Sequence, residues 1–156
     1  MKVWCVRADG GRYIPQFLRF GFIGIGWLPQ VNLLVVTDRQ DLYSLYAEAY
    51  PGVSSRVVMG QQVGQIARFL LEIQSGDYVV SPRRGGQLYY GVVQGGYLYA
   101  NGTDGCPYRH RKPVVWGHTV LKRQTCPLSL QKSLRSILSV FSVSPVEEFL
   151  MLIGER

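Results

Sequence analysis

The chain has 156 residues, a net charge of +7 and an apolar fraction of 47%. This length suits one compact domain with its own core, and the composition argues against disordered and fibrous proteins. The positive charge predicts attraction to polyanions. A membrane surface is a weaker interpretation, because the basic residues fall mostly on predicted turns and strands. We therefore expect a single domain over residues 1–156.

Three cysteines, Cys5, Cys106 and Cys126, are odd in number and lack the spacing of metal ligands. They predict neither a disulfide framework nor a metal site, and no motif indicates a cofactor. No apolar run reaches the length of a membrane span, and Lys2 leads directly into an alternating segment instead of a signal peptide. We expect a cytoplasmic protein without membrane partners.

Strand and helix patterns alternate in the first half of the chain. Residues 3–8 alternate as a strand, and 21–27 (GFIGIGW) indicate a buried strand whose glycines permit close backbone approach. A helix is predicted from Thr37 or Asp38 to the stop at Pro51. A second helix has one apolar stripe and ends at Ser75-Gly76. The stripe comprises Val63, Ile66, Ala67, Leu70 and Leu71.

Strands dominate the second half. The pattern predicts strands over 77–81, 88–94, 97–99 and 113–121, with a helix over 129–138. We find no internal repeat and no long linker. Helices that interrupt a strand-rich chain predict an α+β fold with a mixed sheet that closes on itself.

Aromatic rings and positive charge are concentrated in residues 88–116. Six of the ten tyrosines lie between Tyr78 and Tyr108, and residues 83–123 contain seven Lys or Arg against the single acid Asp104. Flat rings beside concentrated positive charge are typical of surfaces that bind bases and phosphates. For any single tyrosine or charge, a core edge or a solvated face remains the alternative.

Signals for catalysis are weak. His110 and His118 have no metal-ligand partner at helical spacing, and Glu147 and Glu148 are adjacent and therefore point apart. No nucleophile elbow, phosphate-binding loop or Cys-x-x-Cys pair is present. The glycines in 21–26 are spaced in the reverse of the dinucleotide-binding order. We expect no catalytic residue, with a hidden hydrolase triad as the alternative.

Several segments together resemble a known family. GQQVGQIARFLLEIQSGDYVV resembles the helix and Gly-Asp-strand signature of EVE domains in the PUA-like superfamily, which also includes YTH and SRA domains. VWCVRAD, GFIGIGW, YYGVVQGGYLY and RKPVVW resemble other strands of that family. Their order is similar to the N-terminal domain found ahead of Mrr-type nuclease domains in modification-dependent restriction proteins. The resemblance covers about residues 1–141.

This resemblance implies a PUA-like small mixed β-barrel flanked by helices. It also implies a module that binds DNA carrying a modified base, N6-methyladenine or a modified cytosine, flipped into an aromatic pocket. The expected partner is a nuclease domain or subunit, to which the module would give specificity. The alternative is an RNA-binding module that acts on tRNA or rRNA. A catalytic domain that hydrolyses an amide ranks last, because lysines are few.

The resemblance also implies roles for individual residues. Trp27 would form one wall of the base pocket, and Tyr97 or Tyr99, which face the same side of a strand, the other. The pocket floor and the readers of base edges would be Arg7, Ala8, Asp9, Gln61 and Gln65. The phosphate-binding residues would be Arg83, Arg84, Arg109, Arg111 and Lys112. Ala8 departs from the serine usual in relatives, and Gln61 stands where asparagine is expected.

Overall fold

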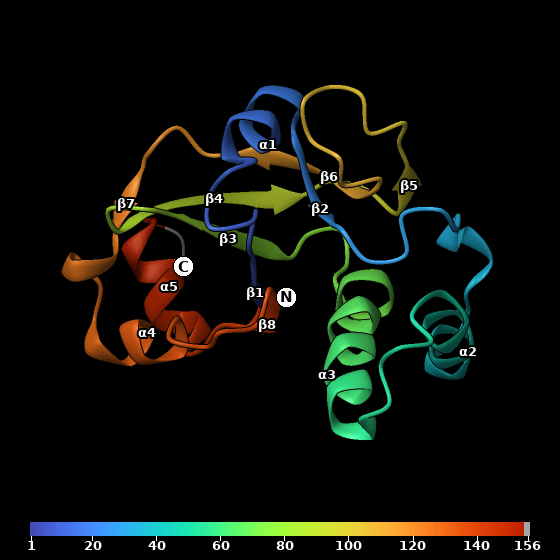
Figure 1. The fold of residues 1–156 in the computed structure, drawn as a ribbon. Coiled ribbons are helices and arrows are strands. Elements are labelled where there is room, and N and C mark those ends of the chain that lie inside the picture. The colour runs from blue at the N-terminus through green and yellow to red at the C-terminus, as the bar shows by residue number, and fades with distance from the viewer. Residues whose placement is uncertain (155–156) are drawn as a thin grey trace.

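A curled mixed sheet forms the centre of the computed structural model, which describes residues 1–154 (Figure 1). Within these residues eight strands follow the path β2-β6-β4-β3-β1-β8, while β5 pairs with β6 and β7 with β4. Only β1 and β3 are parallel among the paired strands of this part of the chain. The strands are β1 (Val3–Val6), β2 (Phe22–Ile25), β3 (Tyr78–Arg83), β4 (Gln87–Val93), β5 (Leu98–Tyr99), β6 (His110–Trp116), β7 (Leu121–Lys122) and β8 (Val140–Ser142).

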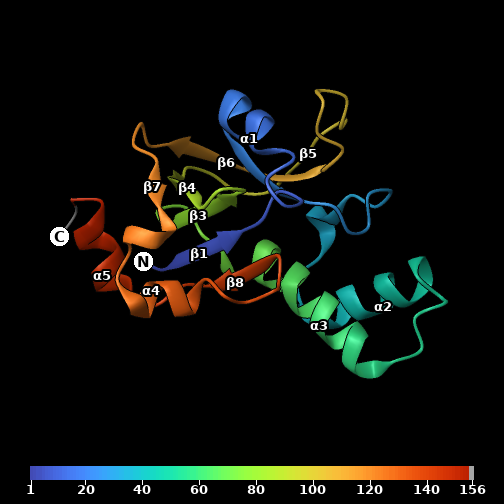
Figure 2. The same cartoon turned by 60° about the vertical axis from the view of Figure 1, so that its left-hand side comes forward.

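Helices flank this sheet, which confirms the predicted α+β class with a half-barrel in place of a closed sheet. Helices α2 and α3 lie side by side at one end, while α4 and α5 lie at the other (Figures 1 and 2). The helices are α1 (Ile14–Phe20), α2 (Arg39–Ala49), α3 (Arg56–Ala67), α4 (Leu128–Ser133) and α5 (Val146–Leu152). Helix α3 continues as the π turn η2 (Arg68–Glu72), and the short 3-10 turns are η1 (Leu33–Val35) and η3 (Arg123–Thr125). No helix within residues 1–154 is both long and apolar enough to cross a membrane.

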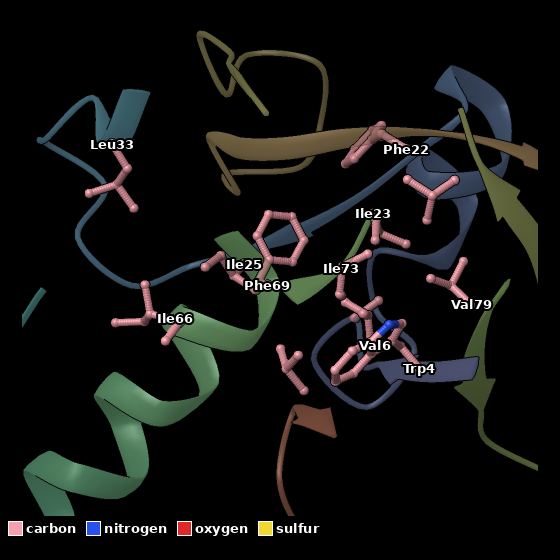
Figure 3. Close-up of a cluster of buried hydrophobic side chains, with 14 of the residues drawn as sticks. Trp4, Val6, Phe22, Ile23, Ile25, Leu33, Ile66, Phe69, Ile73 and Val79 are labelled. Atoms are coloured by element: carbon pink, nitrogen blue, oxygen red, sulfur yellow. The ribbon is translucent and has the colours of Figure 1, made fainter. Parts of the chain in front are cut away.

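Alternate residues of β1 belong to two different cores, because successive side chains of a strand point to opposite faces. Trp4 and Val6 join the larger core, which is built on α1, α2, α3 and the sheet (Figure 3). Val3 and Cys5 join the smaller core beneath α4 and α5. Strand β1 therefore fixes both halves of the domain, and the chain leaves it at Arg7, beside the site described below.

A buried carboxylate fastens the start of β1 to the start of β3. Asp77 accepts hydrogen bonds from the Lys2 backbone N–H, the Trp4 indole N–H and the Gln74 backbone N–H, each at 3.0 Å. These donors hold the charge in a buried position, where an unpaired carboxylate would be costly. Trp4 is thus a core residue with its indole N–H satisfied, and the Gly-Asp turn joins the two strands.

Several predicted boundaries differ from the structure, and two of them bear on the site. Helix α4 ends at Ser133, not at Leu138, because the following carbonyls turn toward the Arg7 side chain. Strand β6 begins at His110 instead of Pro113, since residues 110–113 pair with β2. The basic run Arg109–Lys112 is therefore largely part of the sheet.

Candidate functional site

A pocket of about 240 Å³ lies where the ends of several strands meet. Trp27 follows β2, Tyr108 precedes β6, Arg7 follows β1 and Ser139 precedes β8. The pairing of β1 with β8 and of β2 with β6 brings these four positions together. We call this the aromatic pocket, and its lining residues are Arg7, Gly24, Ile25, Gly26, Trp27, Tyr108 and Ser139.

Glycines in β2 make room for the Tyr108 ring. A Cβ atom on Gly26 would lie 2.8 Å from Cε1 of Tyr108, and one on Gly24 would lie 3.1 Å from its Cβ. The ring also makes an edge contact with Tyr13, with centroids 5.0 Å apart. The glycine spacing of GFIGIGW therefore serves the close approach of an aromatic side chain to the strand.

The two aromatic residues of the pocket have unused polar edges. Within residues 1–154, neither the Trp27 indole N–H nor the Tyr108 hydroxyl has a hydrogen-bond partner. By contrast, the indole N–H of Trp4 binds Asp77 and that of Trp116 binds the Phe17 carbonyl. Buried tryptophan and tyrosine usually pair these groups, so free ones in a pocket are available to a ligand. Burial, together with Asp9, raises the pKa of Tyr108 to about 12, so its hydroxyl remains a donor at neutral pH.

Hydrogen bonds fix the backbone of the segment that follows Trp27. The Leu28 backbone N–H donates to the Tyr50 hydroxyl at 2.9 Å, and the Leu28 carbonyl accepts from His110 Nε2 at 2.8 Å. The Pro29 carbonyl accepts from the Tyr99 hydroxyl at 2.6 Å. Leu28 has a φ of 53°, a left-handed conformation that an apolar side chain adopts only under tertiary constraint. These bonds fix the backbone that carries the Trp27 ring.

Tyr97 and Tyr99 belong to this support and do not line the aromatic pocket. Their rings lie close to that of His110, with centroids 5.8 and 5.5 Å away and interplanar angles of 27° and 24°. His110 Nε2 faces a carbonyl and must donate, so Nδ1 accepts from the Tyr97 hydroxyl at 2.7 Å. Burial lowers the pKa of His110 and favours this neutral form. The sequence placed both tyrosines correctly on one side of a strand, but that side faces a buried histidine.

Gln65 and Arg7 organise the loop between α4 and β8. The buried Gln65 amide oxygen accepts from the backbone N–H groups of Ser139 at 2.6 Å and Val140 at 3.3 Å. The Arg7 guanidinium donates to three carbonyls of residues 134–138 while also lining the aromatic pocket. The Gln65 amide is thus bound to the backbone, whereas Arg7 lines the aromatic pocket.

The remaining predicted base-binding residues lie around the pocket without lining it. Ala8 is buried in the larger core, and Gln61 is exposed on α3. Asp9 is exposed, with a φ of 54°, at the turn that follows β1. Among the residues expected to bind the base, the structure therefore brings Arg7 and Trp27 together. It adds Tyr108, a residue that the sequence did not single out.

Two of the predicted phosphate-binding residues are buried and satisfied internally. Arg111 forms two hydrogen bonds to Asp104, at 2.5 and 2.9 Å, and lowers the pKa of that carboxyl to about 2. Lys112 Nζ donates to the carbonyls of Ile73 at 2.5 Å and Leu70 at 3.3 Å, where η2 ends. Burial lowers the pKa of Lys112 to about 8. Neither charge lies at a surface that a phosphate could reach.

Arg109 is half-buried and supports the backbone. Its guanidinium lies over the Tyr99 ring, 4.3 Å from the centroid, and donates to the carbonyls of Ala100 at 3.0 Å and Pro29 at 3.1 Å. It therefore acts on the same segment as Tyr99, behind Trp27.

Arg83 and Arg84, at the turn between β3 and β4, have free side chains. Both are exposed, and neither guanidinium has a partner within residues 1–154. They line two hollows of about 480 and 340 Å³, and the second of these shares Arg7 with the aromatic pocket. We call this continuous surface the arginine groove, with Asp9 as the one acid among its lining residues. Its basic residues are Arg7, Arg12, Arg83, Arg84 and Arg123.

A metal site is not formed by the described part of the chain. No three His, Cys, Asp or Glu side chains within residues 1–154 lie close enough together to hold an ion. The side chains of the pocket and the groove can stack on a flat ligand, donate hydrogen bonds from Trp27 and Tyr108, and attract anions through arginine.

A family model described as "Domain of unknown function (DUF8426)" matches residues 4–142. The chain is a DUF8426 domain. No curated protein matches the sequence of this DUF8426 domain at a significant level.

The DUF8426 domain is similar in structure to the YTH domain of Zygosaccharomyces rouxii MRB1 protein, solved in complex with N6-methyladenosine RNA. The TM-score is 0.55 at 10% sequence identity, and the match covers 98% of this chain and 84% of that chain. At this identity the likeness shows the fold. It confirms the expected architecture, while the PUA-like superfamily and the narrower EVE and Mrr affinities stay predictions.

Proposed function

We propose that this DUF8426 domain is a binding module that accepts one modified base of DNA in the aromatic pocket. N6-methyladenine and a modified cytosine are the expected ligands. The base would stack against Trp27 and Tyr108, and the unused indole N–H and hydroxyl would donate to acceptors on its edge. The observation that carries the proposal is this pair of rings with free polar groups around a pocket of about 240 Å³.

The size of the pocket supports a single base as the ligand. Pockets for drug-sized molecules measure about 300–1,000 Å³. A volume of about 240 Å³ suits something smaller and flat. An extruded base also loses its stacking in the duplex, at a cost of about a few kcal/mol, which stacking on aromatic rings would offset.

The arginine groove supports a nucleic acid as the carrier of that base. It joins the aromatic pocket at Arg7, so the backbone on one side of the base would cross Arg83 and Arg84. Phosphates bound there would fix the register of the chain without reading sequence. Binding would therefore depend steeply on salt.

In this proposal the module has no catalysis of its own. It would give specificity to a nuclease domain or subunit in a modification-dependent restriction system. RNA is the second candidate, favoured because the similar YTH domain was solved with an RNA. Competition by total RNA against a modified DNA duplex would separate the two partners.

A binding screen tests the proposal. DNA oligonucleotides that differ only in one central base, either unmodified or carrying different modifications, would be titrated against the domain. We expect one modification to bind at least about tenfold more tightly, a difference of about 1.4 kcal/mol. Equal affinity for all of them would contradict the reader function.

Trp27→Ala is the diagnostic variant in that screen. The variant lacks the indole ring on which the base would stack, so it should show no preference for the modified base. The weaker binding that depends on the arginine groove should remain. Phe20→Ala is the matched control, because it removes an aromatic ring that is 48% exposed on α1 and lines neither the pocket nor the groove. If the Trp27 variant kept its preference, the pocket would be misassigned.

A further inference from the structure

The loop between α4 and β8 carries an exposed isoleucine beside the aromatic pocket. Ile137 is 96% exposed, more than any other large hydrophobic side chain in the described part of the molecule. Single exposed apolar residues are common on protein surfaces. This one is unusual for its position, two residues before Ser139, which lines the pocket.

The backbone on both sides of Ile137 is bound by one guanidinium. Arg7 donates from Nη2 to the Ser136 carbonyl at 2.7 Å and from Nε to the Leu138 carbonyl at 3.0 Å. Since Arg7 itself lines the aromatic pocket, these bonds place the Ile137 backbone next to a pocket-lining side chain. Gln65 then fixes the loop where it enters β8, through Ser139.

A braced loop of this kind presents its side chain in one conformation. Most exposed loops are mobile, and a mobile apolar residue would gain little from insertion into a ligand. Ile137 avoids much of that entropic cost because its backbone is fixed and its β-branched side chain is stiff at χ1. The neighbouring Arg135 is exposed, and its guanidinium has no partner within residues 1–154, so it adds a free cation to the loop.

We propose that Ile137 is a wedge that enters the base stack of duplex DNA when a base moves into the aromatic pocket. An apolar side chain inserted between base steps unstacks them and occupies the space that an extruded base leaves. A single strand has no such space to fill. The inference rests on the proposed function and deepens it, because it names duplex DNA as the partner.

The test compares Ile137→Ser with the unaltered domain on two probes. One probe is a short DNA duplex with a central N6-methyladenine, and the other is the modified strand alone. We expect the variant to bind the duplex about tenfold more weakly and the single strand within about twofold, since only the duplex requires the wedge. Equal losses on both probes, or no loss on the duplex, would overturn the proposal.

A third probe separates a wedge from a general loss of structure. In a duplex whose N6-methyladenine faces an abasic site, the base is already unpaired and its extrusion costs less, so Ile137→Ser should lose less affinity there than on the fully paired duplex. Leu128→Ser is the matched control, since Leu128 is 71% exposed on α4 and lines neither the pocket nor the groove. It should leave all three affinities unchanged.

The failure of the wedge is distinct from the failure of the reader function. If Trp27→Ala retained its preference for the modified base, the pocket assignment would fail whatever Ile137→Ser did. If Trp27→Ala lost the preference and Ile137→Ser had no effect, the reader would stand and the wedge would not. Tight binding of the single strand alone would favour RNA or single-stranded DNA as the partner.

Discussion

Two basic segments of this domain have similar composition and opposite environments. In the run Arg109–Lys112 the cations donate to protein oxygens, including the Asp104 carboxylate and the Ile73 carbonyl. At the turn between β3 and β4, Arg83 and Arg84 are exposed and have no partner within residues 1–154. The first segment stabilises the backbone around the aromatic pocket, and the second lines a groove that leads away from it.

The difference shows what decides whether a cation is available to a ligand. A turn exposes its side chains, whereas a strand places alternate side chains on two faces, and both faces are covered where β6 begins, at residues 110–112. Buried cations require oxygen partners, and here the loop before β6 and the end of η2 supply them. Charge counted along the sequence therefore overstates the surface that can bind phosphate.

The largest expected effect comes from breaking a partnered cation. Arg111→Ala removes the guanidinium that donates to the Asp104 carboxylate and to the carbonyls of Cys106 and Tyr108. We expect it to lower the free energy of unfolding by about 3 kcal/mol, whereas Arg84→Ala should change it by less than about 0.5 kcal/mol. Urea denaturation would measure both. Similar values for the two variants would contradict the contrast between the segments.

The exposed segment should have the larger effect on DNA binding. Replacement of Arg83 and Arg84 together by alanine should weaken modified and unmodified DNA alike and reduce the slope of log affinity against log salt by about 2. Binding isotherms at several salt concentrations would measure the slope. Lys122→Ala is a suitable control, because Lys122 is exposed nearby in β7 and lines neither hollow of the groove. An unchanged slope in the double variant would exclude the groove as the phosphate site.

A smaller effect is expected from pH, through His110 at the start of the partnered run. Burial lowers the pKa of His110 below its usual value of 6.5, so the unfolded chain takes up this proton more readily than the folded one. Its contribution to stability is complete above about pH 6.5 and is lost as the pH falls through the lower pKa of the folded state. Unfolding followed at pH 7.5 and pH 5.5 would show the loss.

Two variants isolate that effect. His110→Gln should flatten the pH dependence between these values, because the buried ring no longer titrates. His118→Gln, at an exposed position, should retain the dependence. An identical slope in both variants would assign the titration to another group.

Local patterns predicted much of this fold. The alternation of β1, the glycine-rich β2 and the apolar face of α3 were all evident in the sequence, because each depends on neighbours within a few residues. Trp27 was expected at the pocket from the resemblance of GFIGIGW to a strand of a known family, and it lies two residues after β2. Arg7 followed from the resemblance of its strand to a family.

The rest of the site depends on contacts between distant residues. Tyr108 becomes a pocket wall because Gly24 and Gly26, more than eighty residues earlier, leave room for its ring. Lys112 is buried because the end of η2 supplies carbonyl oxygens beside it. Neither arrangement has a signature in the local sequence.

The hydrogen bonds behind Trp27 have a consequence for altering what the domain binds. The side chains that bind the Leu28–Pro29 backbone are those of Tyr50, Tyr99, Arg109 and His110, and none of them lines the aromatic pocket. Wall and scaffold are thus separate sets of side chains. Substitutions at Trp27 or Tyr108 should change which base is preferred without removing the hydrogen bonds to the Leu28–Pro29 backbone. The domain is therefore a suitable starting point for engineering base recognition.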